Sequence, residues 1–587
     1  MIPKDNSPET PKKLPAARFS FRGMGFRDWI YLGHILERKE RALLVLFVTI
    51  AIVSGTALSA RLLYSRTHEA PKRGGVLREG LLRAPERINP LFLSNNDTDR
   101  DLTMLIFARL FTYDTEGKLE PEIAEGYSES ADGKSYTVNL KQNVLWHDAE
   151  PLTADDVVFT IKTIQDPLYK SSLRPNWQGV TIERLGDYQV RFVLKQPYSP
   201  FLQNLALAII PQHIWRRIPP EAASLSELNA KPVGSGPYRF STLARNTDGI
   251  ITSYTLEANT SFFEDGPYIQ TIQFSFYETE DDLIEAYKAG HIDGVSVVSA
   301  KDVSEMKKLG ASVHGARIPR VFAVFLNESN PILQDKTVRQ ALALAIPRDT
   351  LITDVLGGGA IIIDTPIPPG SFGHNADVPP TPYDPELARK MLEKAGWVDL
   401  NQDGLREKKA AKKKDSPTPL KIALATSDWS DLASTATAIT QYWKDVGVET
   451  DLKIMPISDL ESQVIRPRSY DALLFGEILG RDPDPFAFWH SSQLKDPGLN
   501  IALYHSKKVD TLLEDARRLV DRNQILVKYL EFQKIVDSDF PTIFLYSPTY
   551  FYAVRNTIHG VSLTTLGIPA ERFSNARLWY TKTTRVF

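Results

Sequence analysis

An uncharged stretch close to the N-terminus, residues 42–60, constrains this chain more than any other feature. As a helix it is about long enough to cross a hydrocarbon core of roughly 30 Å. Arg38, Lys39 and Arg41 precede the stretch, and Arg61 follows it. Because Lys and Arg are in excess before it, the pattern predicts a cytoplasmic segment over 1–41, a transmembrane helix over 42–60 and export of the rest of the chain.

Two other interpretations of this stretch remain open. A buried core helix has the same apolar character, but the flanking charges and the change of composition at 71–75 speak against it. A cleaved signal peptide would place Ala57 and Ser59 at the small-residue positions before the cut. The basic segment before the stretch is long for a signal peptide, which favours an uncleaved anchor followed by a polar linker over 61–73.

The size and charge of the chain narrow its class further. Single hydrophobic cores stop growing at roughly 250–300 residues. A chain of 587 residues is therefore expected to form at least two lobes. Residues 1–73 carry 13 Lys/Arg and 6 Asp/Glu, a net charge of +7, so the total of −3 leaves −10 for the remainder. That balance disfavours nucleic acid as a partner. The absence of cysteine excludes disulfides, thiol catalysis, Cys-ligated metals and a lipid anchor on cysteine.

Strand-like and helix-like segments alternate after the linker. Runs with strand periodicity or β-type composition, with turn residues flanking two of them, predict strands over 74–82, 135–140, 189–194, 254–257 and 269–277. Helical periodicity predicts helices over 153–165, 335–345, 384–395, 509–520 and 524–536. Thr153 and Asp384 stand as N-caps, and Gly396 ends the third helix. The alternation without a repeat predicts an α/β fold.

An ordered set of motifs along this part of the chain carries a resemblance. The set comprises Gly-Gly-Val-Leu at 74–77, Leu-Phe-Thr-Tyr-Asp at 110–114, the Trp-His-Asp segment at 146–159, Val-Gly-Ser-Gly-Pro-Tyr at 233–238, Tyr-Asp-Pro at 383–385 and Asp-Pro-Asp-Pro at 482–485. In this order the motifs resemble the family 5 extracellular solute-binding proteins of ABC importers, which bind dipeptides, oligopeptides or nickel.

The resemblance implies a two-lobed clam-shell fold of the periplasmic-binding-protein type, with an extra subdomain in the first lobe. Mapped onto this sequence, lobe I would comprise 74–113 and 232–319, the extra subdomain 114–231, lobe II 320–545 and the C-terminal return to lobe I 546–587. Hinges would lie near 317–325 and 546–552. Closure of the lobes around the solute would couple binding to a change of shape.

The implied function is capture of short peptides for ABC permease subunits by a monomer that is anchored to the membrane by its N-terminal helix. The binding domain would lie outside the cytoplasm, in the periplasm or on the cell surface. A membrane-tethered sensor, or a binder of another solute such as an oligosaccharide, a nickel complex or haem, stays open, because one fold serves many ligands.

The resemblance also implies candidate ligand-binding residues. Asp482 is the candidate for holding a peptide's terminal amine, with Asp484 beside it, although the spacing departs from the family's pattern. If Asp482-Pro483 is the matching pair, the anchor position falls on Leu479. Arg481 would suit an anionic ligand group or pair with a neighbouring Asp. The candidate cleft-lining residues are Tyr113, Trp429, Trp489 and Asn327.

No pattern in the sequence predicts an enzyme, a metal site or a cofactor. His147 and Asp148 lie between a strand and a helix without other ligand spacing, so we interpret them as a hydrogen-bonded turn. Ser235 lacks the five-residue elbow of hydrolases. Asp399, Asn401 and Asp403 match the first half of a calcium loop, but its twelfth position is Ala410, so a polar turn is the expected outcome.

Overall fold

The computed structural model describes residues 37–92, 96–114, 117–409 and 416–586. Most of the predicted cytoplasmic segment 1–41 and the twelfth position of the calcium-like pattern lie outside these residues. The chain divides into two compact units, one formed by 1–70 with 583–587 and the other by 71–582. Each unit is described by itself.

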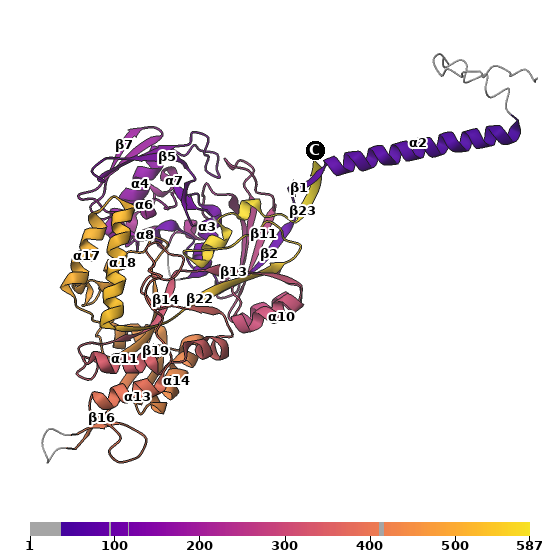
Figure 1. The fold of residues 1–587 in the computed structure, drawn as a ribbon. Helices are drawn as coiled ribbons and strands as arrows, with labels where there is room; N and C mark the ends of the chain where they lie inside the picture. The colour runs from indigo at the N-terminus through magenta and orange to yellow at the C-terminus, as the bar shows by residue number, and fades with distance from the viewer. Residues whose placement is uncertain (1–36, 93–95, 115–116, 410–415, 587) are drawn as a thin grey trace, which may run out of the picture. The chain divides into compact units, whose positions relative to one another are not determined.

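The first unit contains a long apolar helix, α2 (Arg38–Arg66), with a capping box between Glu37 and Glu40 at its start (Figure 1). Within the described part of the chain it is the one helix long and apolar enough to cross a membrane. Its mean hydropathy reaches 2.3, and none of that stretch is buried. The helix continues beyond the predicted 42–60 through residues 61–66, which include no Gly or Pro.

A two-stranded sheet follows the helix, where the sequence predicts a linker. Strand β1 (His68–Lys72) pairs with the C-terminal strand β23 (Lys582–Val586). Arg585 of β23 lies 3.5 Å from the centre of the Tyr64 ring, and its Nη1 donates to Thr67 Oγ1 at 3.1 Å. The C-terminal strand therefore contacts the end of α2.

A mixed sheet of twelve strands forms the frame of the second unit, with β20, β19, β21, β14, β22, β12, β2, β11, β10 and β9 in that order and β13 and β15 paired to β22. The strands span Val76–Leu82 (β2), Tyr238–Arg245 (β9), Ile251–Ala258 (β10), Thr271–Tyr277 (β11), Gly294–Val295 (β12), Ala311–Arg317 (β13), Arg320–Leu326 (β14), Ala360–Ile362 (β15), Lys421–Ser427 (β19), Glu449–Met455 (β20), Ala472–Ile478 (β21) and Thr542–Arg555 (β22). The predicted strands 74–82, 254–257 and 269–277 correspond to β2, β10 and β11.

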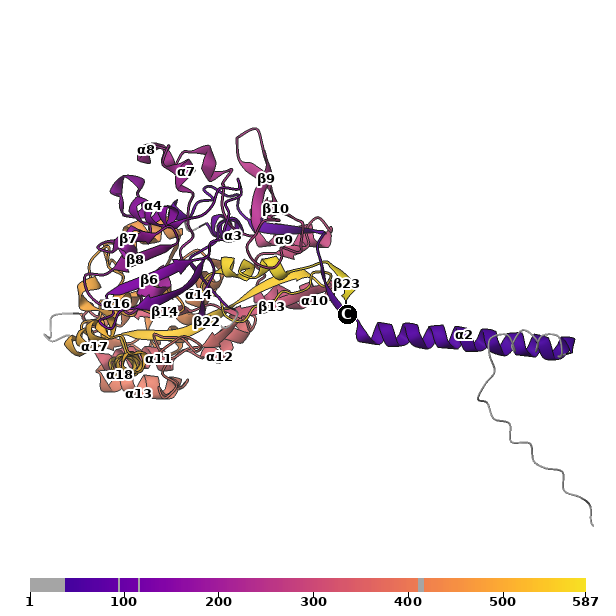
Figure 2. The ribbon, with the colours of Figure 1, turned by 90° about the horizontal axis from the view of Figure 1, so that it is seen from above.

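The long strand β22 runs through the centre of this sheet, past both β14 and β13 (Figure 2). Its residues 542–546 pair with β14, and its residues 549–555 pair with β13. The hydrophobic cores change at the same place. Two clusters of buried hydrophobic residues contain only residues up to Ile318 and from Tyr550 onward. The other two clusters contain only residues between Val321 and Tyr546. We call these two parts region I and region II.

Region I carries a separate antiparallel sheet of four strands in the order β5, β6, β8, β7. These strands span Ala124–Glu129 (β5), Ser135–Leu140 (β6), Thr181–Gly186 (β7) and Gln189–Val193 (β8), so the predicted strands 135–140 and 189–194 correspond to β6 and β8. Helix α4 (Ala154–Gln165) begins at the predicted cap Thr153. Region I also contains helix α3 (Asp97–Ile106), which contacts the 3₁₀ turn η8 (Pro569–Phe573).

Region II packs helices against its part of the large sheet. They are α11 (Lys336–Leu344), α13 (Pro385–Lys394), α14 (Ser430–Asp445), α17 (Lys507–Arg518) and α18 (Arg522–Asp539), and α17 and α18 lie side by side in Figure 1. Asp384 caps α13 by accepting from Leu387 N at 2.8 Å, as its sequence predicts. All of these except α14 correspond to predicted helices.

Candidate functional site

The candidate site lies where the loop after β21 meets region I. This loop, residues 479–485, leads into the short helix α16 (Phe486–Trp489). Its Arg481 is almost fully buried, with 7% of the side chain exposed. The Arg481 guanidinium donates from Nε to Glu571 Oε2 at 3.0 Å and from Nη2 to the Thr565 carbonyl at 2.8 Å. An arginine of region II is thus held by a carboxylate and a carbonyl of region I.

Tyr113 completes this cluster. The Arg481 guanidinium lies 4.9 Å from the centre of the Tyr113 ring, a cation–π distance. Burial, with the Glu571 carboxylate, raises the pKa of the Tyr113 hydroxyl, so the phenol stays neutral. The sequence singles out Tyr113 and Arg481, and the structure brings them together as one cluster with Glu571.

The two aspartates of the loop are both in ion pairs. Asp482 lies 2.9 Å from Arg522, and Asp484 lies 2.6 Å from Arg517, both partners being in region II. The Asp482 backbone carbonyl also accepts from Gln203 of region I at 2.6 Å, and Asp484 accepts from the Tyr198 hydroxyl at 3.2 Å. The loop is therefore tied to region I through three successive contacts, at 481, 482 and 484.

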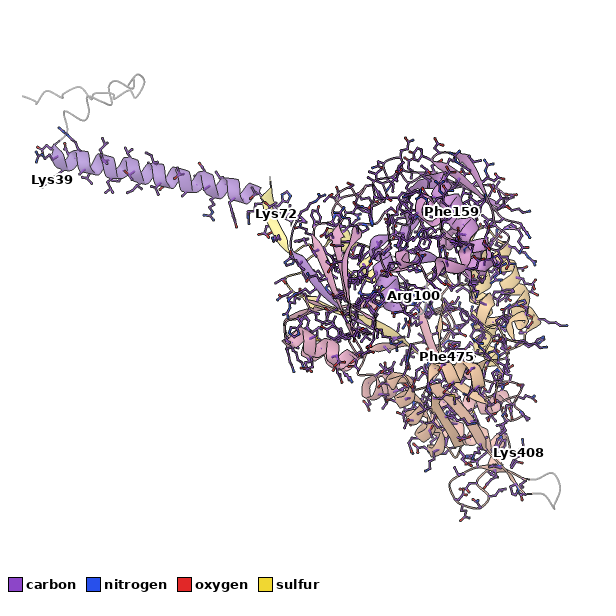
Figure 3. The ribbon with its side chains drawn as sticks, turned by 180° about the vertical axis from the view of Figure 1, so that it is seen from behind. Lys39, Lys72, Arg100, Phe159, Lys408 and Phe475 are labelled. Carbon is purple, nitrogen blue, oxygen red and sulfur yellow. The ribbon has the colours of Figure 1, made fainter. Side chains whose placement is uncertain are left out.

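Two cavities flank the Arg481 cluster. A larger one of about 220 Å³ is lined by region I residues, among them Arg100, Arg109, Tyr113, Trp177, Gln203 and Glu571. Figure 3 labels Arg100, which in that view lies between Phe159 of region I and Phe475 of region II. A smaller cavity of about 80 Å³ is lined by both regions, with Gly117, Arg317 and Thr565 from region I and Ile361, Gly370 and Arg481 from region II.

Buried charge surrounds the larger cavity. Burial lowers the pKa of the Arg109 guanidinium, and the Glu122 and Glu571 carboxylates oppose that effect. The Glu122 carboxylate accepts from the Arg109 backbone N–H at 3.0 Å, and burial raises the pKa of Glu122 to about 7. Cavities of this kind, apolar with a few placed polar groups, are typical of ligand sites.

Trp489 does not line the cleft, contrary to the prediction. Its side chain is 1% exposed and packs in the core of region II against Tyr504, Phe532 and Phe544. The physical reason is that α16 turns its large apolar side chain inward, where it fills the space between helices and sheet. Leu479, the alternative anchor position, is likewise part of this core.

Asn327 and Trp429 also lie elsewhere. Asn327 is buried, and its side chain donates to the Tyr470 carbonyl at 2.7 Å and accepts from Ser329 N at 2.9 Å, so it fixes a turn. It lines neither of the two cavities. Trp429 is 57% exposed at the start of α14 and lines neither of the two cavities.

Sequence reasoning missed several lining residues. Glu571, Gln203, Trp177 and Arg317 belong to no motif, and their positions in the chain are far from the loop at 479–485. A buried carboxylate opposite an arginine leaves no spacing signal when the two are 90 residues apart. Only the return of the C-terminal segment to region I brings Glu571 to Arg481.

His147 holds a turn, as its sequence context indicates. Its Nδ1 accepts from Gly234 N at 3.2 Å, and its Nε2 lies 3.1 Å from the Gly236 carbonyl. Burial lowers the pKa of His147 to about 4, so the ring is neutral at pH 7. Over the described residues no group of three or more His, Asp or Glu side chains is placed to hold a metal ion.

The calcium-like pattern forms a polar turn in the described part of the chain. Asp399 accepts from Gly404 N at 3.0 Å, and Asp403 accepts from Leu405 N at 2.8 Å. The carboxylates thus satisfy backbone N–H groups of their own loop.

Comparison with known proteins gives consistent matches. The family model described as bacterial extracellular solute-binding proteins, family 5 middle, matches residues 118–498. The oligopeptide-binding protein AppA of Bacillus subtilis is 30% identical over 541 residues, which cover 89% of this chain and 96% of the relative.

Solved structures agree with these matches. The structure of AppA from Bacillus subtilis in complex with a nonapeptide has a TM-score of 0.71 and 29% identity, covering 87% of this chain and 99% of that one. The substrate-binding protein CtaP of an ABC transporter from Listeria monocytogenes has a TM-score of 0.76 and 26% identity, covering 87% of this chain and 100% of that one.

Proposed function

Because the chain belongs to the family 5 extracellular solute-binding proteins of ABC importers, we propose that it captures short peptides between regions I and II and presents them to permease subunits. Members of this family are substrate-binding proteins and not enzymes. The peptide as solute is suggested by the relative named an oligopeptide-binding protein and by its structure with a nonapeptide.

The observation that carries this proposal is the pair of cavities around the Arg481 cluster, one of them walled by both regions. A solute in the smaller cavity touches region I and region II together only while they are closed. Its binding free energy then favours the closed form over the open one. The larger cavity has apolar walls, including Trp177 and Leu207, that suit a peptide side chain.

Closure would take place about the strands that pass from one region to the other. We place the lobe boundaries at 319/320 and 545/546, with hinges near 317–325 and 546–552 and an extra subdomain over 114–231. This assignment is supported by the change of hydrophobic cores between Ile318 and Val321. A register shift between Phe322 and Ala323 opposite β22 interrupts the ladder at the same place.

The N-terminal helix supports the cellular part of the proposal. Helix α2 would anchor a monomer in the membrane, with residues 71–582 outside the cytoplasm. Its length and its mean hydropathy of 2.3 support this, as does the excess of Lys and Arg before it.

Native mass spectrometry of the full chain, purified in detergent, tests the choice of solute. We expect a set of co-purified masses that tandem fragmentation identifies as short peptides. After removal of these ligands, added peptides should restore the bound masses. A co-purified oligosaccharide, haem or nickel complex, with no peptide binding by the emptied protein, would contradict the proposal.

A further inference from the structure

Another cavity, of about 210 Å³, lies within region II and has no wall residue in common with the two cavities at the Arg481 cluster. Its walls are the π-helix η6 (Leu460–Ile465) with the turn after it, the end of β21, α16 and the segment 496–501. The loop 479–485 joins β21 to α16. We call this space the region II cavity; two of its walls directly flank the loop of the candidate site.

Glu477 of β21 brings a carboxyl group without a partner to this cavity. The residue is 4% exposed, forms part of the wall and has no hydrogen bond or ion pair to the described residues. Its Oε2 is fully enclosed, whereas Oε1 keeps accessible surface and is therefore the oxygen that is open to the cavity. Burial raises the pKa of Glu477 well above its usual range, which favours the neutral acid. A buried polar group without a partner is costly.

The apolar walls of the region II cavity suit an aliphatic chain with a positive end. Phe475, which Figure 3 labels, and Phe488 are half-buried aromatic residues of the lining. The lining also includes Ile465 and Ile501. Aromatic faces attract an ammonium or guanidinium group, and apolar side chains cover the stem that carries it.

The other charged groups of the lining do not neutralise Glu477. Glu461 and Asp496 are exposed carboxylates, and Arg466 is an exposed guanidinium. Arg468 donates from Nε, Nη1 and Nη2 to backbone carbonyls, so all its nitrogens are in use. Burial is the cause of the raised pKa of Glu477, and neither arginine opposes it. The counter-charge for this carboxyl group is therefore left for a ligand to supply.

From this arrangement we propose that the region II cavity binds a cationic group on an aliphatic chain, an ammonium or a guanidinium, with Glu477 as its counter-charge. The cation replaces the proton on Glu477 and gives the buried carboxylate a charge-assisted hydrogen bond. Glu477 then selects basic side chains over neutral ones of similar length. The cation is supplied by a basic side chain of the captured peptide or by a free amine, and only the first source rests on the proposed function.

Calorimetry on the full, ligand-free chain in detergent tests this with Lys-Lys-Lys and with tri-norleucine, which has aliphatic side chains of similar length and no ammonium groups. Glu477→Gln should reduce the preference for Lys-Lys-Lys over tri-norleucine at least about tenfold, because the amide keeps the shape of the neutral acid but takes no negative charge. That result identifies a peptide side chain as the source of the cation. An unchanged preference overturns the inference while leaving peptide capture intact.

A matched control connects the effect to the cavity. Glu221→Gln removes a carboxylate from an exposed position on the helix α8 (Pro220–Ala223) and should leave the preference unchanged. An equal loss of preference in both variants would show a general effect of charge and overturn the assignment to Glu477.

If Glu477→Gln does not fold, the unmodified chain decides by proton release, measured at pH 7 in two buffers of different ionisation enthalpy. Lys-Lys-Lys should release up to about one proton more per chain than tri-norleucine, since the cation displaces the proton of the buried acid. The two peptides have the same terminal groups, whose contributions cancel. Equal release by the two peptides overturns the inference.

If neither peptide binds, the proposed function fails, and n-hexylammonium against hexan-1-ol decides the cavity separately. Ligand-observed magnetic resonance should show binding of the amine, with loss of that binding in Glu477→Gln. This result supports the cavity and identifies a free amine as its source. No difference between amine and alcohol overturns the inference.

Discussion

At the scale of single residues, Asp482 forms the more exposed of the two ion pairs made by the aspartates of the loop. Its partner Arg522 has 62% of its side chain exposed, whereas the Asp484 pair with Arg517 is more buried and also involves Tyr198. An exposed ion pair contributes little to stability, so a peptide amine could replace Arg522 at Asp482 at small cost. Asp484, in contrast, is held by both Arg517 and the Tyr198 hydroxyl.

We therefore expect Asp482→Ala to weaken peptide binding at least about tenfold, because the amine loses its counter-charge. Calorimetry with a peptide from the co-purified set measures the change. Asp451→Ala, an exposed aspartate on β20, serves as the control. Unchanged affinity in Asp482→Ala would remove Asp482 as the amine anchor.

A second residue-scale feature is a buried group of two carboxylates and one guanidinium in region I. Arg572 is bonded to Asp101 at 2.6 Å and lies 3.5 Å from Glu79, and all three are essentially unexposed. Burial raises the pKa of Glu79 to about 7, and Arg572 opposes the effect. The folded chain therefore holds a proton on Glu79 that the unfolded chain releases at lower pH.

This predicts that stability falls as the pH rises from about 4.5 to about 7, by about 1–3 kcal/mol for Glu79. Because the folded-state pKa is the higher one, the stabilisation is present at low pH and lost through neutrality. Urea unfolding of the full chain at pH 5 to 8 measures it. Glu79→Gln should make the profile less steep, with the remaining slope due to Glu122 and Asp101, whose pKa values burial also raises, and the exposed Glu461→Gln should leave it unchanged. An unchanged slope in Glu79→Gln would refute the assignment.

At the scale of elements, the turn at 233–238 packs directly on the end of α3. Gly236 N donates to the Ile106 carbonyl at 2.8 Å. A Cβ on Gly236 would lie 2.6 Å from the Leu105 carbonyl oxygen and 2.7 Å from that of Ile106. Glycine is required here by close approach of two backbones and not by a positive φ.

Gly236→Ala should therefore lower the free energy of unfolding by about 3 kcal/mol, since backbone must move to admit the methyl group. Thermal and urea unfolding of the full chain measure the effect. Gly126→Ala on β5 is the matched control, because a Cβ there has no neighbour within 4 Å. Equal stability of the two variants would show that the turn can relax.

At the scale of the whole molecule, α2 would decide where the chain resides. We expect the full chain to sediment with membranes and to need detergent for release, because moving its apolar surface into water is unfavourable. A variant lacking residues 1–70 should be recovered in the soluble fraction. Finding the full-length gene product soluble, with a mature N-terminus near Ala60, would favour a cleaved signal peptide over an anchor.

Local sequence signals were enough to identify many of the elements and the family. Periodicity, caps and turn residues predicted α4, α13 and β6 because those signals act over a few neighbouring residues. The ordered motifs pointed to a solute-binding protein of family 5, and the matching family model and relatives agree.

Which side chains meet depended on tertiary packing alone. Tyr113, Arg481 and Glu571 come from three distant segments, and no local rule links them. For the same reason two tryptophans that are each 1% exposed differ in their surroundings: Trp489 packs within the core of region II, and Trp177, also part of a core, borders the larger cavity. Burial and pairing are set by how whole elements pack, and a sequence pattern records only the element to which each side chain belongs.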